Sequence, residues 1–167
     1  MREATPEDAE AIVSVTAAGW QEGYRDIVDA ERLATLPIDR WRHEVGVGLR
    51  RPVDDAFTYL AELDGEFAGY CFVAAPGRDA DIDREVAEVV AMYVAPRHWR
   101  RGVGGALMTA ATDRLAGLPY TEAVLWTFKE NARAIGFYER YGWKADGAEK
   151  IHARSGAPAI RMRRPLP

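Results

Sequence analysis

The first hydrophobic pattern along the chain is that of an amphipathic helix. Thr5 can cap its amino terminus, Pro6 suits the first helical position, and Asp8 can return the hydrogen bond of a capping box. Apolar or small residues then recur every three or four positions, at Ala9, Ile12, Val13, Thr16 and Trp20. A helix is therefore predicted here, preceded at most by a short strand in residues 1–4.

Further helices and strands follow from the same patterns. A second helix is predicted from Ala30 through Leu49, with Leu33, Leu36 and Trp41 facing inward. Two strand-like runs in residues 57–75 flank Asp64-Gly65, a pair that tolerates the positive φ angles of a tight hairpin turn.

The second half of the chain alternates strands with helices. Strands are predicted at 86–94 and 122–128, and closing strands at "GWKA" and "PAIRMRR". The helix after the first of these strands should bury one face, formed by Val103, Ala106, Leu107, Ala110, Ala111, Leu115 and Leu118. Asn131 should cap the last helix and Gly142 should end it. The order indicates an α/β fold with a mixed sheet.

Length and charge narrow the class of protein. The 167 residues, 48% of them hydrophobic, fit one domain spanning 1–167. The 22 Lys and Arg are outnumbered by 26 Asp and Glu, which disfavours nucleic-acid binding. The longest apolar run, at 89–95, is too short to span a membrane, and the single cysteine, Cys71, excludes an internal disulfide. We therefore expect a cytoplasmic protein.

The sequence "RRGVGGA" at 100–106 places glycines at the start of a helix. Free backbone N–H groups and the positive end of the helix dipole favour an anion there. A phosphate-binding NTPase loop would need a lysine after Gly104, where Gly105 stands. A dinucleotide site would need a third glycine at Leu107, although Glu122 lies at the spacing of the ribose-binding acid. Three arginines, Arg97, Arg100 and Arg101, lie in this turn, and one or two of them are expected to touch phosphate.

A wider stretch resembles a known family. "EVVAMYVAPRHWRRGVGGALM", followed by "NARAIGFYERYGW", resembles the GNAT superfamily of N-acetyltransferases, which bind acetyl-coenzyme A. The resemblance is strongest over residues 88–143, and the motif of Arg or Gln, two residues, Gly, one residue, Gly or Ala falls on Arg101, Gly104 and Ala106. It implies a mostly antiparallel, twisted central sheet with flanking helices.

The resemblance also implies where the cofactor binds. The pyrophosphate would be held by N–H groups in the turn and the pantetheine arm would pair with a strand. The residues so implied are Met92, Tyr93, Val94, Arg100, Arg101, Gly102, Val103, Gly104, Gly105, Ala106, Asn131 and Tyr138. Asn131 is expected to cap its helix as well as to approach the cofactor.

Two residues are candidates for catalysis by the same resemblance. Tyr138 would donate a proton or a hydrogen bond to the departing thiolate, and its alternative role is that of a core aromatic. Glu88 matches a position that carries a glutamate in many relatives and would serve as a base, directly or through a water chain; its alternative is an exposed carboxylate at a strand end. Trp126 stands where some relatives place a base, which closes that route.

The acceptor is the part that the sequence describes least. In relatives the segment after the first helix walls the acceptor site, which makes Trp20, Glu22 and Tyr24 candidates, with a core role as the alternative for Trp20. The acidic run Asp79, Asp81 and Asp83 could attract an ammonium group. The three histidines lack metal-ligand spacing, so no metal is expected.

The sequence thus predicts an N-acetyltransferase acting on a primary amine of a small molecule or peptide by direct transfer in a ternary complex. The alternative is a non-catalytic acyl-CoA-binding module of the same fold. An exposed sheet edge would allow two copies to pair as a homodimer.

Overall fold

The computed structural model describes residues 1–51 and 55–166. Its strands are β1 (Arg2–Glu3), β2 (Phe57–Leu63), β3 (Glu66–Ala74), β4 (Val86–Val94), β5 (Glu122–Phe128), β6 (Lys144–Ile151) and β7 (Pro158–Pro165). Its helices are η1 (Pro6–Asp8), α1 (Ala9–Gly23), α2 (Ala30–Ala34), α3 (Ile38–Arg50), η2 (Pro96–His98), α4 (Val103–Ala116) and α5 (Ala132–Arg140). The alternation of strands and helices predicted for the second half of the chain is confirmed.

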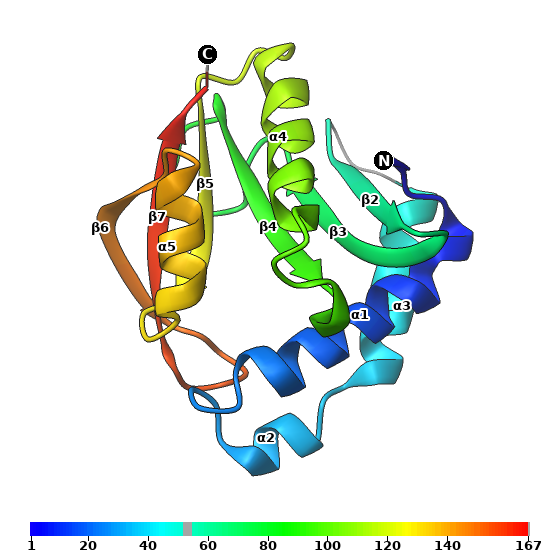
Figure 1. The fold of residues 1–167 in the computed structure, drawn as a ribbon. Helices are drawn as coiled ribbons and strands as arrows, with labels where there is room; N and C mark the ends of the chain where they lie inside the picture. Colours follow the sequence, from blue (N-terminus) through cyan, green and yellow to red (C-terminus); the bar gives the residue numbers. More distant parts are fainter. Residues whose placement is uncertain (52–54, 167) are drawn as a thin grey trace.

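Within the described residues, seven strands form one sheet in the order β1-β2-β3-β4-β5-β7-β6. All neighbouring strands are antiparallel except β4 and β5, which run parallel. This parallel pair is short, because its register covers only Val86–Val89 against Glu122–Leu125. Beyond these residues the two strands separate, and Figure 1 shows the gap that opens between them.

The helices cover both faces of the sheet (Figure 1). Because side chains alternate along a strand, Cys71 packs with the cluster under α4 while its neighbour Tyr70 packs with the cluster under α1. On β4, Met92 likewise belongs to the α4 face, and Ala91 and Tyr93 belong to the α1 face. The strand β4 therefore separates two layers of the molecule, each with its own apolar cluster.

The first helix begins as its sequence predicts. The backbone N–H of Thr5 donates to the Asp8 carboxylate over 2.7 Å, and Pro6 starts a 3-10 turn that leads into α1. The single helix predicted from Ala30 through Leu49 is wrong, because the chain forms α2 and α3 with a break before Ile38. Pro37 explains the break, since proline disfavours a helical conformation in the residue before it and cannot donate a backbone hydrogen bond.

The hairpin turn is confirmed, but the predicted buried face of the helix after β4 is confirmed only in part, because Ala110 and Leu118 are half-buried. The hairpin turn between β2 and β3 is confirmed, with positive φ at both Asp64 (56°) and Gly65 (78°). In α4, the prediction that Ala106 is buried is wrong, because Ala106 is exposed. Met108 and Thr112 instead complete the buried face of the helix.

Candidate active site

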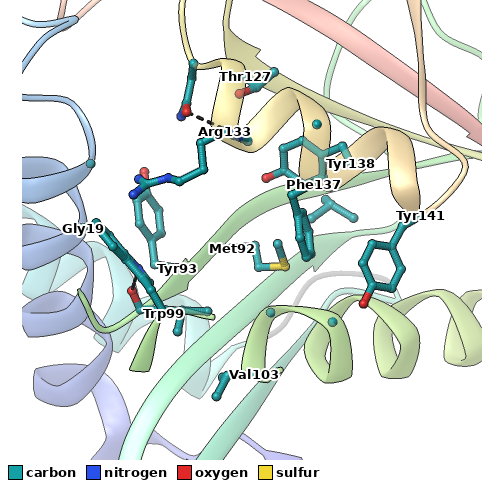
Figure 2. Close-up of a pocket in the computed structure, with 18 of the residues that line it drawn as sticks. Gly19, Met92, Tyr93, Trp99, Val103, Thr127, Arg133, Phe137, Tyr138 and Tyr141 are labelled. Atoms are coloured by element: carbon teal, nitrogen blue, oxygen red, sulfur yellow. Dashed lines mark hydrogen bonds between the residues drawn. The ribbon is translucent and has the colours of Figure 1, made fainter. Parts of the chain in front are cut away.

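A cavity of about 1020 Å³ occupies the gap where β4 and β5 separate. Its walls come from the ends of these strands, the amino terminus of α4, helix α5 and the end of α1. Figure 2 shows Met92, Phe137 and Tyr138 directed into the same space from β4 and α5. The short parallel pairing of β4 and β5 is thus the cause of the cavity, because a continued ladder would close it.

The amino terminus of α4 offers the cavity a row of backbone N–H groups. Among the described residues, no group accepts a hydrogen bond from the backbone N–H of residues 100–105, whereas Ala106 N–H already bonds to Gly102 C=O. Gly102 has a φ of 85° and Arg100 a φ of 62°, which turn the chain sharply ahead of the helix. Such a row at a helix amino terminus binds anions.

Two of the three arginines in this turn are directed away from the cavity. Arg101 pairs with Asp64 over 2.8 Å and lies 3.2 Å from His98 Nδ1, and Arg97 pairs with Glu66 over 3.1 Å. The hairpin turn between β2 and β3 therefore braces the turn before α4. Arg100 is the one of the three that lines the cavity. The side chain of Arg101 is thus not placed with the other predicted cofactor residues.

The end of β4 presents a free backbone edge to the same cavity. Ala95 N–H donates to Ala68 C=O next to β3, so by strand alternation Tyr93 also turns its backbone toward β3. Met92 and Val94 therefore turn their backbone groups toward the gap between β4 and β5. The indole of Trp99 donates to Val94 C=O over 2.8 Å, which leaves Val94 N–H facing the cavity. Of the three strand residues predicted to bind the cofactor, Met92 and Val94 thus face the cavity with backbone groups. Tyr93 contributes its side chain.

Helix α5 begins after Asn131, the predicted cap, and carries Tyr138, the residue predicted to act on the thioester. Asn131 Oδ1 accepts from Ala134 N–H over 3.1 Å, so its capping role is confirmed, and Asn131 also lines the cavity. Tyr138 lines it too, and no described residue hydrogen-bonds to its hydroxyl. Burial raises the pKa of Tyr138, which keeps that hydroxyl protonated at neutral pH. Tyr138 can therefore donate a hydrogen bond into the cavity.

Close packing joins α5 to α4. The hydroxyl of Tyr141 points at the first turn of α4 in Figure 2, where a Cβ on Gly105 would lie only 2.1 Å from it. A side chain at position 105 would therefore displace the Tyr141 hydroxyl from its present place. Gly104 differs, because a Cβ there would meet Phe137 and Val94 at ordinary distances of 3.5 and 3.7 Å.

Glu88 lies on the α1 face of β4 and is only 4% exposed. Its carboxylate accepts from the backbone N–H of Arg78 (3.1 Å) and from the Arg78 guanidinium (3.1 and 3.3 Å). Among the described residues, Glu88 lines neither this cavity nor the second one described below, which Arg78 does line. The alternative of an exposed strand-end carboxylate is therefore wrong, and Arg78 stands between Glu88 and solvent.

Comparison with known proteins identifies the family. The model of the Acetyltransferase (GNAT) family matches residues 20–143. The chain belongs to the GNAT family of acetyltransferases. A mycothiol acetyltransferase of Acidimicrobium ferrooxidans is 30% identical over 142 residues, covering 84% of this chain and 41% of that protein. A probable N-acetyltransferase of Mycobacterium tuberculosis is 25% identical over 151 residues, covering 88% of this chain and 80% of that protein.

Solved structures share the GNAT fold. The PaiA N-acetyltransferase of Thermoplasma acidophilum, in complex with coenzyme A, has a TM-score of 0.75 at 19% identity, covering 98% of this chain and 96% of that one. The ribosomal-protein-alanine N-acetyltransferase of Brucella melitensis has a TM-score of 0.76 at 18% identity, covering 99% and 98%. The chain spans less than half the length of the first mycothiol acetyltransferase, so only the shared domain is compared there.

A second cavity of about 870 Å³ lies on the face of the sheet that α1 and α3 cover. The sequence did not predict this cavity. It is walled by α1, α3, the open faces of β2 and β3, and the turn between β6 and β7. The two cavities share three lining residues of β4, Val90, Ala91 and Tyr93. Val90 is an unpaired bulge in the β3–β4 register. The two spaces therefore meet at β4.

Two of the three predicted acceptor residues are brought together: the rings of Trp20 and Tyr24 pack edge to face with their centroids 5.2 Å apart, and Glu22 lies apart from them. Trp20 is buried, donates from Nε1 to the Tyr93 hydroxyl over 2.9 Å, and lines the second cavity. Tyr24 lines the first cavity, with its hydroxyl 3.5 Å from that of Tyr93. Glu22 is exposed, pairs with Arg25 and lines neither of these cavities. The core role left open for Trp20 is thus confirmed.

The acidic run is largely neutralised. The buried guanidinium of Arg161 contacts Asp81 at 2.8 Å and Asp79 at 3.4 Å. Asp79 also accepts from Trp126 Nε1 over 2.6 Å. These two carboxylates therefore hold their loop on the sheet, and the expectation that they attract an ammonium group is not supported.

The thiol of Cys71 is not ionised and is therefore a poor nucleophile. Burial raises the pKa of the Cys71 thiol to about 12, so the thiol is un-ionised at neutral pH. The described residues contain no group of three or more His, Cys, Asp or Glu side chains able to hold a metal ion. None of the helices in residues 1–51 and 55–166 is long and apolar enough to cross a membrane.

Proposed function

We propose that this GNAT domain transfers the acetyl group of acetyl-coenzyme A to a primary amine of a small molecule or peptide, by direct attack in a ternary complex. The observation that carries the proposal is the meeting of three features in the first cavity. These are the open N–H row of residues 100–105, the free edge of β4, and the proton-bearing hydroxyl of Tyr138.

The residues present fit the cofactor. A pyrophosphate accepts hydrogen bonds and is anionic, which is what the N–H row and the α4 dipole favour. The backbone edge of Met92 and Val94 suits the amides of a pantetheine arm, which would extend the sheet as an added strand. Arg100 and Arg133 line the cavity without a carboxylate partner among the described residues, so their charges are available to phosphate. Arg101 contributes its backbone N–H rather than its guanidinium.

Bound acetyl-coenzyme A would supply a thioester, whose carbonyl the amine attacks and whose sulfur leaves as a thiolate. Val94 N–H faces the cavity from β4 and would donate to the carbonyl oxygen as negative charge develops there. Tyr138 would donate a hydrogen bond to the sulfur. Because burial raises its pKa, the tyrosine hydroxyl stays protonated and would stabilise the departing thiolate as a hydrogen-bond donor.

The attacking amine must first lose its ammonium proton. Glu88 lies on the face of β4 opposite to α4, the face that carries the second cavity, and its carboxylate is held by Arg78. A water between Arg78 and the junction of the cavities would carry the proton to this carboxylate. Glu88 is proposed to act in this way, through water rather than by direct contact.

The test is thiol release from acetyl-coenzyme A across a panel of primary amines, with mass spectrometry of the acetylated product. Transfer to at least one amine, reduced in Tyr138→Phe, supports the proposal. The competing function is a module that binds acyl-coenzyme A without catalysis. It would be favoured by cofactor-dependent thermal stabilisation without amine-dependent thiol release across the whole panel.

A further inference from the structure

The second cavity is walled by apolar side chains that the fold leaves partly exposed. Val45 and Leu49 of α3, Phe72 of β3 and Ala91 of β4 pack against the apolar cluster under α1, and each is only half-buried. All four line this cavity, together with the half-buried ring of Trp41. Apolar surface that is exposed inside a concave space favours an apolar ligand, because the ligand removes that surface from water.

Three polar side chains on the same wall have no hydrogen-bond donor left for a ligand. The Thr16 hydroxyl donates to Ile12 C=O over 2.8 Å, so Tyr70 must be the donor in the 2.8 Å contact between the Tyr70 and Thr16 hydroxyls. The indole N–H of Trp20 donates to the Tyr93 hydroxyl over 2.9 Å. A ligand rich in oxygen atoms would find no donor on this part of the wall, and a buried acceptor without a partner is costly.

The charged groups of the wall oppose a second positive charge in the ligand. The described lining includes three arginines and two glutamates, which are Arg51, Arg78, Arg154, Glu3 and Glu44. Both glutamates already have partners, because Glu3 lies 2.9 Å from Arg114 and Glu44 lies 2.6 Å from Arg40. A second ammonium group in the cavity would therefore find no free carboxylate among these lining residues, and an unpaired buried charge is unfavourable.

A ligand in this cavity can present its amino group at β4. Val90, Ala91 and Tyr93 line both cavities. Met92 and Val94 alternate with Ala91 and Tyr93 along the strand and turn their backbone groups toward the first cavity. A nitrogen atom at this junction would therefore lie beside Val94 N–H, the group proposed to donate to the thioester carbonyl.

We infer that the acceptor is a primary monoamine with an uncharged, apolar body, an alkylamine or arylalkylamine, whose body fills the second cavity and whose amino group lies at the junction on β4. This inference rests on the proposed acetyl transfer and names its acceptor class. The free amine forms a bond from nitrogen to the acetyl carbon, the carbon–sulfur bond breaks, and one proton of the nitrogen ends on the thiolate. The products are an apolar amide and the thiol of coenzyme A.

The experiment measures kcat/KM for amines of matched size. From butylamine to octylamine, each methylene that enters the cavity should raise kcat/KM about three- to fourfold until the space is filled. Hexylamine should exceed its oxygen-containing isostere 2-(2-aminoethoxy)ethanol by about tenfold or more, because two methylenes are replaced by oxygen. Heptylamine should exceed 1,6-diaminohexane by at least about tenfold, because a terminal methyl group is replaced by an ammonium group that the wall leaves unpaired.

Two variants of α3 test the wall directly. Val45→Asp adds a carboxylate to the cavity, so it should lower kcat/KM for heptylamine about tenfold and abolish or reverse the preference over 1,6-diaminohexane. Val47→Asp is the matched control, because Val47 is 45% exposed on the same helix and lines neither cavity; it should leave the preference unchanged. Leu49→Ala removes apolar bulk from the wall and should move the optimum of the alkylamine series to a longer chain.

Thermal stabilisation by coenzyme A, which all three variants should retain, shows which of them fold. The inference is overturned if 1,6-diaminohexane matches heptylamine in the wild type, or if kcat/KM does not rise along the alkylamine series. It is also overturned if folded Val45→Asp and Val47→Asp share one preference. Should Val45→Asp not fold, an unchanged chain-length optimum in Leu49→Ala overturns it.

The amine panel separates this inference from the proposed function. If polyamines or peptides react and apolar monoamines do not, the inference fails while the proposed acetyl transfer stands. If no amine of any class releases thiol, the proposed function itself fails, and this inference fails with it.

Discussion

The two cavities that meet at β4 are built from different materials. In the first cavity, the groups expected to bind the cofactor belong to the backbone. They are the N–H row of residues 100–105 and the free edge at the end of β4. The second is lined by side chains from α1, α3, β2–β4 and the β6–β7 turn, which are far apart in the sequence. The N–H row of the first cavity is a consequence of local chain geometry, whereas the lining of the second cavity depends on the assembled fold.

This difference indicates how the two halves would tolerate substitution. A backbone site accepts many side chains as long as none enters the space of the ligand, which suits a cofactor shared by a whole family. A site lined by side chains changes its ligand preference whenever one of the lining residues is substituted. The predictions below test whether the two halves are separable in this way.

The largest effect is expected from a charge placed against the N–H row. Gly104→Glu should lower the affinity for coenzyme A about 100-fold or more, because it puts a negative side chain where an anion is expected to bind. At a cofactor concentration near 100 times the wild-type dissociation constant, most of the about 2.7 kcal/mol of stabilisation would disappear. A thermal-shift titration measures this directly.

The matched control for this change is Gly48→Glu. Gly48 lies in α3 on the second cavity, and a Cβ there would meet nothing within 4 Å. Its substitution should leave cofactor stabilisation intact. Equal stabilisation of the wild type and the folded Gly104→Glu variant would remove the pyrophosphate assignment.

The next effect concerns hydrogen-bond donation. Tyr138→Phe should lower kcat roughly 10- to 1000-fold while the KM for acetyl-coenzyme A stays within a few fold, since only the hydroxyl is lost. Steady-state kinetics with an accepted amine provides the measurement. Unchanged turnover would return Tyr138 to the role of a core aromatic.

A smaller loss is expected at Glu88. Glu88→Gln keeps an oxygen for Arg78 N–H but removes the basic charge, so kcat should fall about 10- to 100-fold. The fall should be greatest at neutral pH and diminish as the pH approaches the pKa of the amine, where free amine no longer needs a base. A pH profile of kcat for the variant and the wild type tests this, and parallel profiles would exclude a base role.

The smallest effect is predicted at the wall of the second cavity. Trp20→Phe removes the hydrogen bond to the Tyr93 hydroxyl and should cost about 1 kcal/mol of unfolding free energy. Its effect on catalysis should appear in the KM for the acceptor and not in cofactor affinity. Urea denaturation and acceptor kinetics provide the two readouts, and a selective loss of cofactor binding would contradict the separation of the halves.

The sequence predicts the cofactor half far better than the acceptor half. The glycines at 102–105, the cap at Asn131 and the hairpin turn at Asp64 are local patterns, so their structural consequences can be read from neighbouring residues. The direction of the Arg101 side chain could not be predicted in this way. It depends on Asp64, which lies 37 positions away in the chain and is brought near by the β2–β3 hairpin.

Long-range contacts also explain the remaining misses. The pairing of Asp79 and Asp81 with Arg161 joins segments about half the chain apart, so the acidic run looked free in the sequence. The sequence assigned no binding role to His152 and did not single out Arg154. Only the packing of that turn beside Trp20 and Trp41 gives them a place in a cavity.

The most direct test of the account is a backbone amide NMR titration of the protein with coenzyme A. The account predicts that the largest shifts occur at the N–H groups of residues 100–105 and at Met92 and Val94. The β6–β7 turn around His152 should change little. Shifts that cluster around the second cavity and leave residues 100–105 unperturbed would contradict the assignment of the two halves.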